Sequence, residues 1–121
     1  RLVLDGGAYC SWTGTTIGKG SILAPGPYDI ENVLVEAFAV YTNKTTTGAM
    51  RGFGAPQVCF AYESQMDDIA HKLGLDPLEI RLRNGFSENS LSPTSQTLQS
   101  VALKESLAQA AERFGWKERQ S

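Results

Sequence analysis

Cysteine and histidine are scarce in this chain of 121 residues, which contains two cysteines and one histidine. Cys10 and Cys59 are too few for a disulfide framework, and neither lies in a Cys-x-x-Cys pair. The single His71 excludes the usual His/Cys zinc spacings and leaves little room for a Ser/His catalytic system. We interpret both cysteines as buried thiols in a reducing cytosol, and we predict a cytoplasmic location and no metal-ligating residue.

Strong net charge and long apolar runs are also absent. A net charge of -2 gives no electrostatic reason to expect binding to nucleic acid or to an anionic membrane. No apolar run approaches the roughly 20 residues of a membrane span, and the start RLVLDGG lacks the features of a signal peptide. This start has no initiator methionine and opens directly into a strand-like run. We therefore expect the chain to be an excised piece of a longer protein.

The chain does contain strand-like segments with turn residues between them. Residues 1–12 have β-type composition broken by Gly6 and Gly7, which predicts a strand with a kink or bulge. Residues 33–41, VLVEAFAVY, are the clearest strand and are apolar on both faces apart from Glu36. Such a pattern is typical of a strand that is buried on both sides.

Helical patterns surround these strands. Residues 16–24 are compatible with a short helix weakened by two glycines. A longer helix that ends at Gly74 is predicted by apolar residues at spacings of four and three, which are Val58, Tyr62, Met66, Ile69 and Leu73. Asp76, Pro77 and Glu79 form the N-terminal signature of another short helix, with a capping box.

The C-terminal third contains a loop and a last helix. Residues 86–97 are polar, rich in Ser and Thr and without periodicity, which predicts an exposed loop. A final helix is predicted within 98–116, and Gly115 ends it. The whole pattern predicts an α+β fold in which helices pack on strands.

The stretch GAMRGFGAPQ, residues 48–57, places Arg51 and Phe53 among three glycines and before a proline. Glycine allows positive φ or close approach to a ligand, and proline suits the first turn of a helix. The spacing matches neither a dinucleotide-binding GxGxxG nor a P-loop. Unpaired N–H groups at residues 54–56, with the charge of Arg51 and the ring of Phe53, favour a pocket for an aromatic or carbonyl-bearing substrate. A structural turn with a salt-bridged Arg51 and a core Phe53 is the alternative.

Three stretches also resemble a known family. GPYDIENVLVEAFAVYTNKTTTGAMRGFGAPQ, IAHKLGLDPLEIRLRN and DGGAYCSW are similar to the large subunit of the molybdenum hydroxylases, the xanthine dehydrogenase and aldehyde oxidase family. The resemblance covers residues 4–85. It implies that residues 1–121 are a fragment of a larger molybdopterin-binding domain.

The resemblance assigns expected roles to individual residues. It implies that Met50, Arg51 and Gly52 bind the molybdopterin-type molybdenum cofactor, and that Phe53 packs against a bound heterocycle. A glycine at Gly52 argues against the carbon monoxide dehydrogenase branch, which carries a copper-binding cysteine there. Lys19 matches a substrate-binding arginine of the xanthine-using members. A lysine keeps the charge but loses the bidentate fork, which weakens the case for a purine.

The activity implied by the resemblance is hydroxylation of a heterocycle or aldehyde with oxygen from water, by an oxidoreductase whose iron–sulfur clusters and FAD lie elsewhere. The catalytic glutamate of the family lies downstream of the matched region, and we interpret Glu31, Glu36 and Glu63 as solvated or ion-paired. The fragment is therefore expected to form one wall of the site and to be inactive alone.

Two alternatives to the fragment hypothesis remain open from the sequence. One is a stand-alone interaction or cofactor-handling domain that reuses the fold, and the other is a plain α+β domain without a site. Under the fragment hypothesis, the partners are other domains or subunits of the parent enzyme. The apolar strand at 33–41 would then be uncovered in the isolated chain, which predicts self-association.

Overall fold

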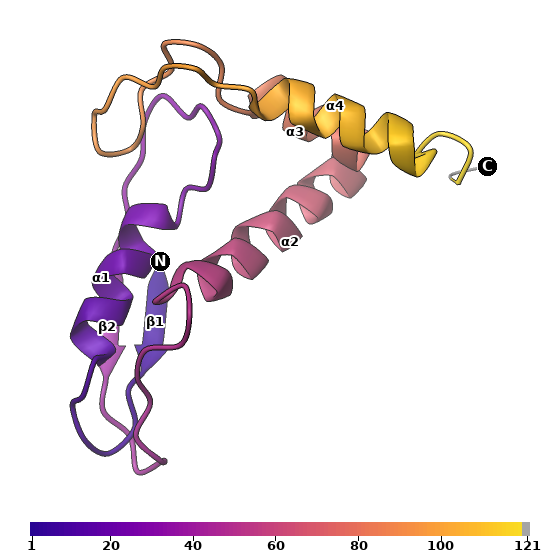
Figure 1. The fold of residues 1–121 in the computed structure, drawn as a ribbon. Coiled ribbons are helices and arrows are strands. Elements are labelled where there is room, and N and C mark those ends of the chain that lie inside the picture. Colours follow the sequence, from indigo (N-terminus) through magenta and orange to yellow (C-terminus); the bar gives the residue numbers. More distant parts are fainter. Residues whose placement is uncertain (120–121) are drawn as a thin grey trace. The chain divides into compact units, whose positions relative to one another are not determined.

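The computed structural model describes residues 1–119, which form two compact units. The first unit comprises residues 1–26 and 32–63, and the second comprises residues 27–31 and those from 64 onward. The α+β class predicted from the sequence is confirmed. The elements run in the order β1 (Leu2–Asp5), α1 (Thr13–Leu23), β2 (Ala37–Val40), α2 (Ala55–Leu73), α3 (Pro77–Asn84) and α4 (Leu103–Phe114) (Figure 1).

In the first unit, β1 and β2 form a parallel pair in which Leu2 lies opposite Ala37 and Asp5 lies opposite Val40. Parallel neighbours need a crossover connection, and α1 lies in that crossover and contacts both strands (Figure 1). One face of α1 is buried, at Thr13, Thr16 and Gly20. This face brings α1 close to the start of α2, because a Cβ added at Gly20 would lie 3.4 Å from Val58 Cγ1.

The two glycines after β1 end the strand instead of kinking it. Gly7 has a φ of 73°, and a Cβ added there would lie 2.2 Å from the Thr45 carbonyl oxygen. The carbonyl oxygens of Gly6 and Gly7 accept hydrogen bonds from the N–H groups of Thr47 and Thr42. The glycines therefore allow the segment after β2 to pack directly against the end of β1.

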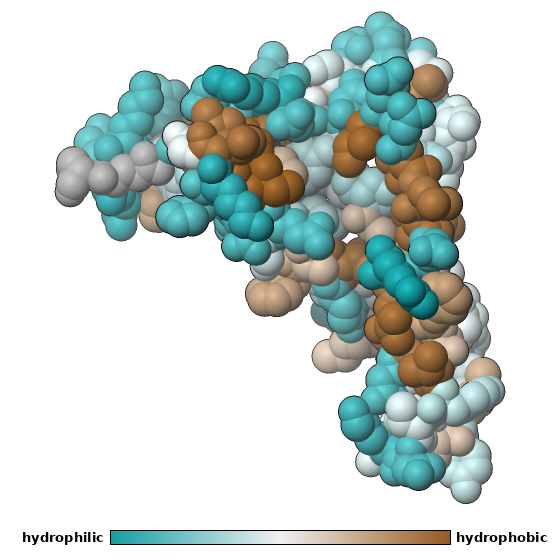
Figure 2. Space-filling model, turned by 180° about the vertical axis from the view of Figure 1, so that it is seen from behind, coloured by the Kyte–Doolittle hydropathy of each residue, from teal (hydrophilic) through white to brown (hydrophobic). Residues whose placement is uncertain are grey.

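The apolar residues within 33–41 are uncovered in the described chain, as expected for an isolated piece, but the strand is shorter than predicted. The strand β2 covers only Ala37–Val40, and the Leu34 side chain before it is 87% exposed. Phe38 is also exposed, at 42%. Apolar residues accordingly reach the surface as brown patches in Figure 2. A sheet with two strands among the described residues offers no second layer to cover both faces of β2.

The predicted burial of the cysteines is wrong. Cys10 and Cys59 are free, as expected, but both are exposed. Cys10 lies in the loop that connects β1 to α1. Cys59 follows the buried Val58 on α2, where one residue of helical rotation turns the side chain away from the packed face.

The second unit contains the end of α2 and the two later helices. α2 ends at Leu73, before Gly74 with its φ of 64°, as predicted. Asp76 Oδ1 then accepts hydrogen bonds from the N–H groups of Leu78, at 2.6 Å, and Glu79, at 3.2 Å. The predicted N-cap of α3 is confirmed. The Glu79 carboxylate pairs with Arg83 one turn later.

Residues 86–97 form the predicted loop and are mostly exposed, although Ser90 within it is buried. Tyr28 is buried and forms a bridge with Gly85, while Ser90 is buried and donates a hydrogen bond of 2.8 Å to Asp29 Oδ2. Residues 27–31 are thus attached to the chain after α3. The predicted last helix is α4, which begins only at Leu103 and ends before Gly115, with a φ of 68°.

Candidate functional site

The glycine-rich loop before α2 has an unusual backbone. Gly52, Phe53 and Gly54 have φ values of 95°, 54° and 97°. The Phe53 N–H donates to the Met50 carbonyl oxygen at 2.7 Å, and the Ala55 N–H donates to that of Gly52 at 3.0 Å. Positive φ is costly for a residue with an aromatic side chain, so contacts outside the loop must hold this conformation.

Both flanking glycines lie where a side chain does not fit. A Cβ added at Gly52 would lie 2.6 Å from Pro56 Cδ, and one added at Gly54 would lie 2.5 Å from the Thr16 carbonyl oxygen. The positive φ expected for the glycines is confirmed. The loop is packed against α1 at Gly54, which is buried, and is open at Gly52, which is exposed.

Phe53 is half-buried and meets a second aromatic residue. Its ring centroid lies 5.9 Å from that of Trp12, and the ring planes are inclined at 71°, an edge-to-face contact. Trp12 directly precedes α1, and its carbonyl oxygen accepts hydrogen bonds from the N–H and hydroxyl of Thr16, each at 2.8 Å. Sequence reasoning did not select Trp12. The only signal was its place in DGGAYCSW.

The three residues that were predicted to bind the cofactor lie on the exposed part of the loop. Met50 is 72% exposed, and Arg51 and Gly52 are exposed as well. Within residues 1–119, the Arg51 guanidinium makes no ion pair or hydrogen bond. The alternative of a salt-bridged Arg51 and a core Phe53 therefore does not describe this structure.

Free backbone donors lie at Gly54, as the sequence indicated, and also earlier in the loop. Of the N–H groups expected to be unpaired at residues 54–56, that of Gly54 donates no hydrogen bond to any described residue, whereas that of Ala55 donates to Gly52 and Pro56 has none. The N–H groups of residues 48–52 also donate no hydrogen bond to any described residue. The unpaired donors of residues 48–52 thus lie on the exposed part of the loop, whereas Gly54 is buried.

Lys19, the remaining predicted site residue, is exposed on α1. No hydrogen bond or ion pair joins it to residues 48–54 in the part of the chain that the structure describes. The residue that follows it, Gly20, does approach the loop, since a Cβ added there would lie 3.8 Å from the Gly54 carbonyl oxygen. The structure therefore brings Phe53 and Trp12 together but leaves Lys19 without a polar contact to them.

A polar cluster anchors the segment that leads into the loop. Asp5 accepts hydrogen bonds from Thr42 Oγ1 at 2.6 Å and from the Gly7 N–H at 3.0 Å, and Lys44 Nζ lies 2.8 Å from its carboxylate. The hydrogen bond with Lys44 is the main cause that lowers the pKa of Asp5 to about 2, and the hydrogen bonds from Thr42 and Gly7 add to this effect. The same pairing raises the pKa of Lys44.

The two cysteines each lie beside a tyrosine. The hydrogen bond with Cys10 raises the pKa of Tyr41. Burial is the main cause that raises the pKa of Tyr62, and the hydrogen bond with Cys59 adds to it.

Residues 1–119 contain no group of three or more His, Cys, Asp and Glu side chains placed to hold a metal ion. No helix in this described region is long and apolar enough to cross a membrane.

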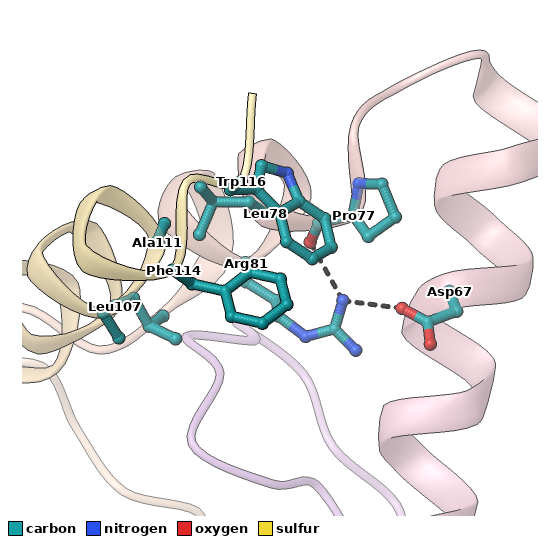
Figure 3. Close-up of a pocket in the computed structure, with 9 residues that line it drawn as sticks. Asp67, Pro77, Leu78, Arg81, Leu107, Ala111, Phe114 and Trp116 are labelled. Carbon is teal, nitrogen blue, oxygen red and sulfur yellow. Dashed lines mark hydrogen bonds and ion pairs between the residues drawn. The ribbon is translucent and has the colours of Figure 1, made fainter. Parts of the chain in front are cut away.

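A separate pocket of about 550 Å³ lies within the second unit, between α3, α4 and the end of α2 (Figure 3). Its walls are mainly apolar and include Leu107, Phe114 and Trp116. Arg81 Nη1 lies in it and donates to Asp67 Oδ1 at 2.7 Å and to the Pro77 carbonyl oxygen at 2.9 Å. None of the residues predicted from the sequence to form the site lines this pocket.

Known proteins are similar to this chain in sequence. The nicotinate dehydrogenase large molybdopterin subunit of Eubacterium barkeri is 42% identical over 110 residues, which is 90% of this chain and 26% of that protein. The putative xanthine dehydrogenase molybdenum-binding subunit of Escherichia coli K12 is 49% identical over 82 residues, 67% of this chain and 11% of that protein. The chain thus spans about a quarter of the first relative and less of the second.

A solved structure is similar to this chain in fold as well as in sequence. Quinoline 2-oxidoreductase from Pseudomonas putida 86 matches with a TM-score of 0.83 and 30% identity, over 98% of this chain and 16% of that one. The molybdopterin cofactor-binding domain family matches residues 1–85, which include the loop, Trp12 and Lys19. On this evidence, the chain belongs to the molybdopterin cofactor-binding domain family.

Proposed function

We propose that this chain is part of the large subunit of a molybdenum hydroxylase, an oxidoreductase that hydroxylates a heterocycle or an aldehyde with oxygen derived from water. The loop of residues 48–54 carries the proposal, because it lies in the family match and combines unpaired backbone donors with a fixed aromatic ring. In this proposal, residues 1–121 are a fragment of the molybdopterin-binding domain, and residues 4–85 are its family-specific part.

The residues of the loop fit a molybdenum cofactor with oxygen-rich, anionic groups. The N–H groups of residues 48–52 are unpaired within the described chain, and backbone donors of this kind bind anions well. Arg51 adds a positive charge that no described carboxylate neutralises. Gly52 is exposed and has no side chain to obstruct a large group. We assign cofactor binding to Met50, Arg51 and Gly52.

When bound, the cofactor would supply the redox centre that accepts two electrons from the substrate. The contribution of this chain is positioning. Phe53 presents a ring against which a flat substrate can stack, and Lys19 offers a cation to a polar substituent. No catalytic base is assigned, because Glu31 and Glu36 are exposed and neither belongs to the loop. The base is proposed to come from another part of the longer protein.

The partners and location follow from this proposal. The other domains or subunits of the parent enzyme, which would carry iron–sulfur clusters and FAD, are the proposed partners, and they would cover the exposed apolar residues around β2. The isolated chain, in which these residues are uncovered, is proposed to self-associate. A cytoplasmic location is proposed because both cysteines are free thiols.

The test is the molybdenum content of the natural full-length protein purified from its source, measured by mass spectrometry of the metal. About one molybdenum per large subunit is the expected result for a site that binds one cofactor. A folded, intact protein without molybdenum would contradict the proposal and leave the loop as a scaffold without a cofactor.

A further inference from the structure

We infer that Trp12 is a positioning residue, which fixes the orientation of the Phe53 ring and through it the orientation of a flat substrate. The inference rests on the proposed function, because it concerns the same site. It assigns a role to the DGGAYCSW stretch, which lies some 40 residues before the loop and to whose residues the family resemblance assigned no individual role.

The Phe53 ring needs an external support. Its φ of 54° is disfavoured for an aromatic residue, and the neighbours on either side are glycines, which offer no side chain to pack against it. Trp12 provides an aromatic contact at 5.9 Å, with the ring planes at 71°. Edge-to-face contact is a directional preference of aromatic pairs, so Trp12 restricts the tilt of the Phe53 ring.

Thr16, which lies against Gly54 of the loop, also binds the backbone of Trp12. Thr16 is 5% exposed and donates both its N–H and its hydroxyl to the Trp12 carbonyl oxygen. The carbonyl oxygen of Thr16 lies so close to Gly54 that no side chain fits there. The first turn of α1 therefore fixes the backbone beside both the Trp12 ring and the Phe53 ring.

The geometry also limits what Trp12 does directly. Because the two ring planes are inclined at 71°, a flat molecule stacked on Phe53 cannot also stack on Trp12. Trp12 therefore acts through Phe53 and not as a second stacking platform. This distinction makes the inference testable, since two residues that act through one contact give non-additive effects.

The test is a double-mutant cycle in the full-length protein with Trp12→Ala, Phe53→Ala and both together. Loss of one aromatic contact is expected to lower kcat/KM of Trp12→Ala roughly three- to tenfold, mainly through kcat because the substrate is misaligned. Trp12→Phe keeps an aromatic edge and is expected to stay within about twofold of the wild type. The double variant is expected to equal Phe53→Ala within about twofold, since Trp12 has no ring left to position.

Trp116→Phe is the matched control, because Trp116 also lies near a phenylalanine, Phe114, but belongs to the second unit. Its kinetics are expected to be unchanged. Molybdenum content and thermal unfolding are measured for every variant, and Trp12→Leu, which keeps bulk without a ring, replaces Trp12→Ala if the latter does not fold.

Three results would overturn the inference while the proposed function stands. They are wild-type kinetics for Trp12→Ala, multiplicative losses in the double variant, and equal loss of molybdenum from Trp12→Ala and Trp12→Phe. The last result would mean that Trp12 serves folding or cofactor retention. Absence of molybdenum from the wild-type protein would instead contradict the proposed function itself.

Discussion

The Thr42 hydroxyl donates a hydrogen bond of 2.6 Å to the Asp5 carboxylate and so joins the segment after β2 to the end of β1. The connection continues toward the loop, because Thr47 Oγ1 donates to the Asp5 carbonyl oxygen at 2.7 Å and Thr13 Oγ1 donates to that of Thr47 at 3.2 Å. The chain that enters the glycine-rich loop is therefore fixed to both β1 and α1.

The first prediction concerns the pH dependence of this junction. Lys44, then Thr42, lowers the pKa of Asp5 to about 2, compared with about 3.9 in an unfolded chain. Because the folded-state pKa is the lower one, the stabilisation is present above about pH 4 and is lost as the pH falls toward 2. Urea unfolding between pH 6 and 2 is expected to show a steeper loss of stability for the wild type than for Asp5→Asn, and added salt is expected to reduce the difference, because Lys44 is 77% exposed. Identical pH profiles would contradict this role.

The second prediction concerns the approach of α1 to the loop. Gly54→Ala is expected to destabilise the chain by about 1–3 kcal/mol, because the new Cβ would meet the Thr16 carbonyl oxygen at a φ of 97°. Gly18→Ala is the matched control on α1, since nothing lies within 4 Å of its added Cβ, and it is expected to stabilise the helix by up to about 1 kcal/mol. Denaturant midpoints of both variants measure the difference, and equal effects would count against the packing.

The third prediction concerns Phe53 in the full-length protein. Phe53→Ala is expected to lower kcat/KM roughly three- to tenfold through lost stacking, with molybdenum content unchanged. Phe60→Ala, at a 78% exposed position on α2, is the control and is expected to have no kinetic effect. Loss of the metal together with the activity would mean that the Phe53 ring is structural.

The fourth prediction concerns the cap of α3. Asp76 accepts two N–H groups of the first turn and also a hydrogen bond of 2.9 Å from Trp116 Nε1. Its replacement by Ala is expected to cost about 1–3 kcal/mol, and Asp76→Asn, which keeps an acceptor for the cap, is expected to cost less. Asp68→Ala, at an exposed position of α2, is the control in the same urea titration. A loss no larger than that of Asp68→Ala would show that the cap is unimportant.

The fifth prediction concerns self-association of the isolated chain. Leu34 and Phe38 expose apolar side chains at 87% and 42%, and the two-stranded sheet has open edges among the described residues. Light scattering is expected to show species larger than a monomer as the concentration rises. Leu34→Lys is expected to reduce them, since it places a charge on the surface without removing a buried contact. A wild-type chain that stays monomeric at high concentration would refute the prediction.

Local signals in the sequence were sufficient for much of the fold. The periodic apolar residues before Gly74 and the Asp76-Pro77 start predicted α2 and α3 correctly, because caps and helical periodicity depend on neighbours within one or two turns. The motif around Arg51 and Phe53 likewise indicated the family that the comparison confirms. Gly52 and Gly54 of the loop adopt the positive φ that only glycine takes up without strain.

The expectations that failed depended on contacts distant in the sequence. The length of the strand predicted at 33–41 depends on its pairing with β1, and the burial predicted for Cys10 and Cys59 depends on what packs beside them. Of the unpaired donors expected at residues 54–56, that of Ala55 is used within the turn, and the sequence did not indicate the further free donors of residues 48–52.

The sequence by itself therefore determined that the helices form, that α2 and α4 end before a glycine, the need for glycine in the loop and the family, because each of these is encoded in a short stretch of chain. It did not determine that α1 begins at Thr13 or that α4 begins at Leu103. Only the tertiary structure decided three contacts. The Trp12 ring contacts the Phe53 ring, the Thr16 carbonyl oxygen packs against Gly54, and the Asp5 carboxylate accepts a hydrogen bond from Thr42 in the segment that leads to the loop. Those contacts join residues 37 to 41 positions apart, and no local pattern can specify them, because they depend on how α1 and β1 pack once the parallel pair has formed.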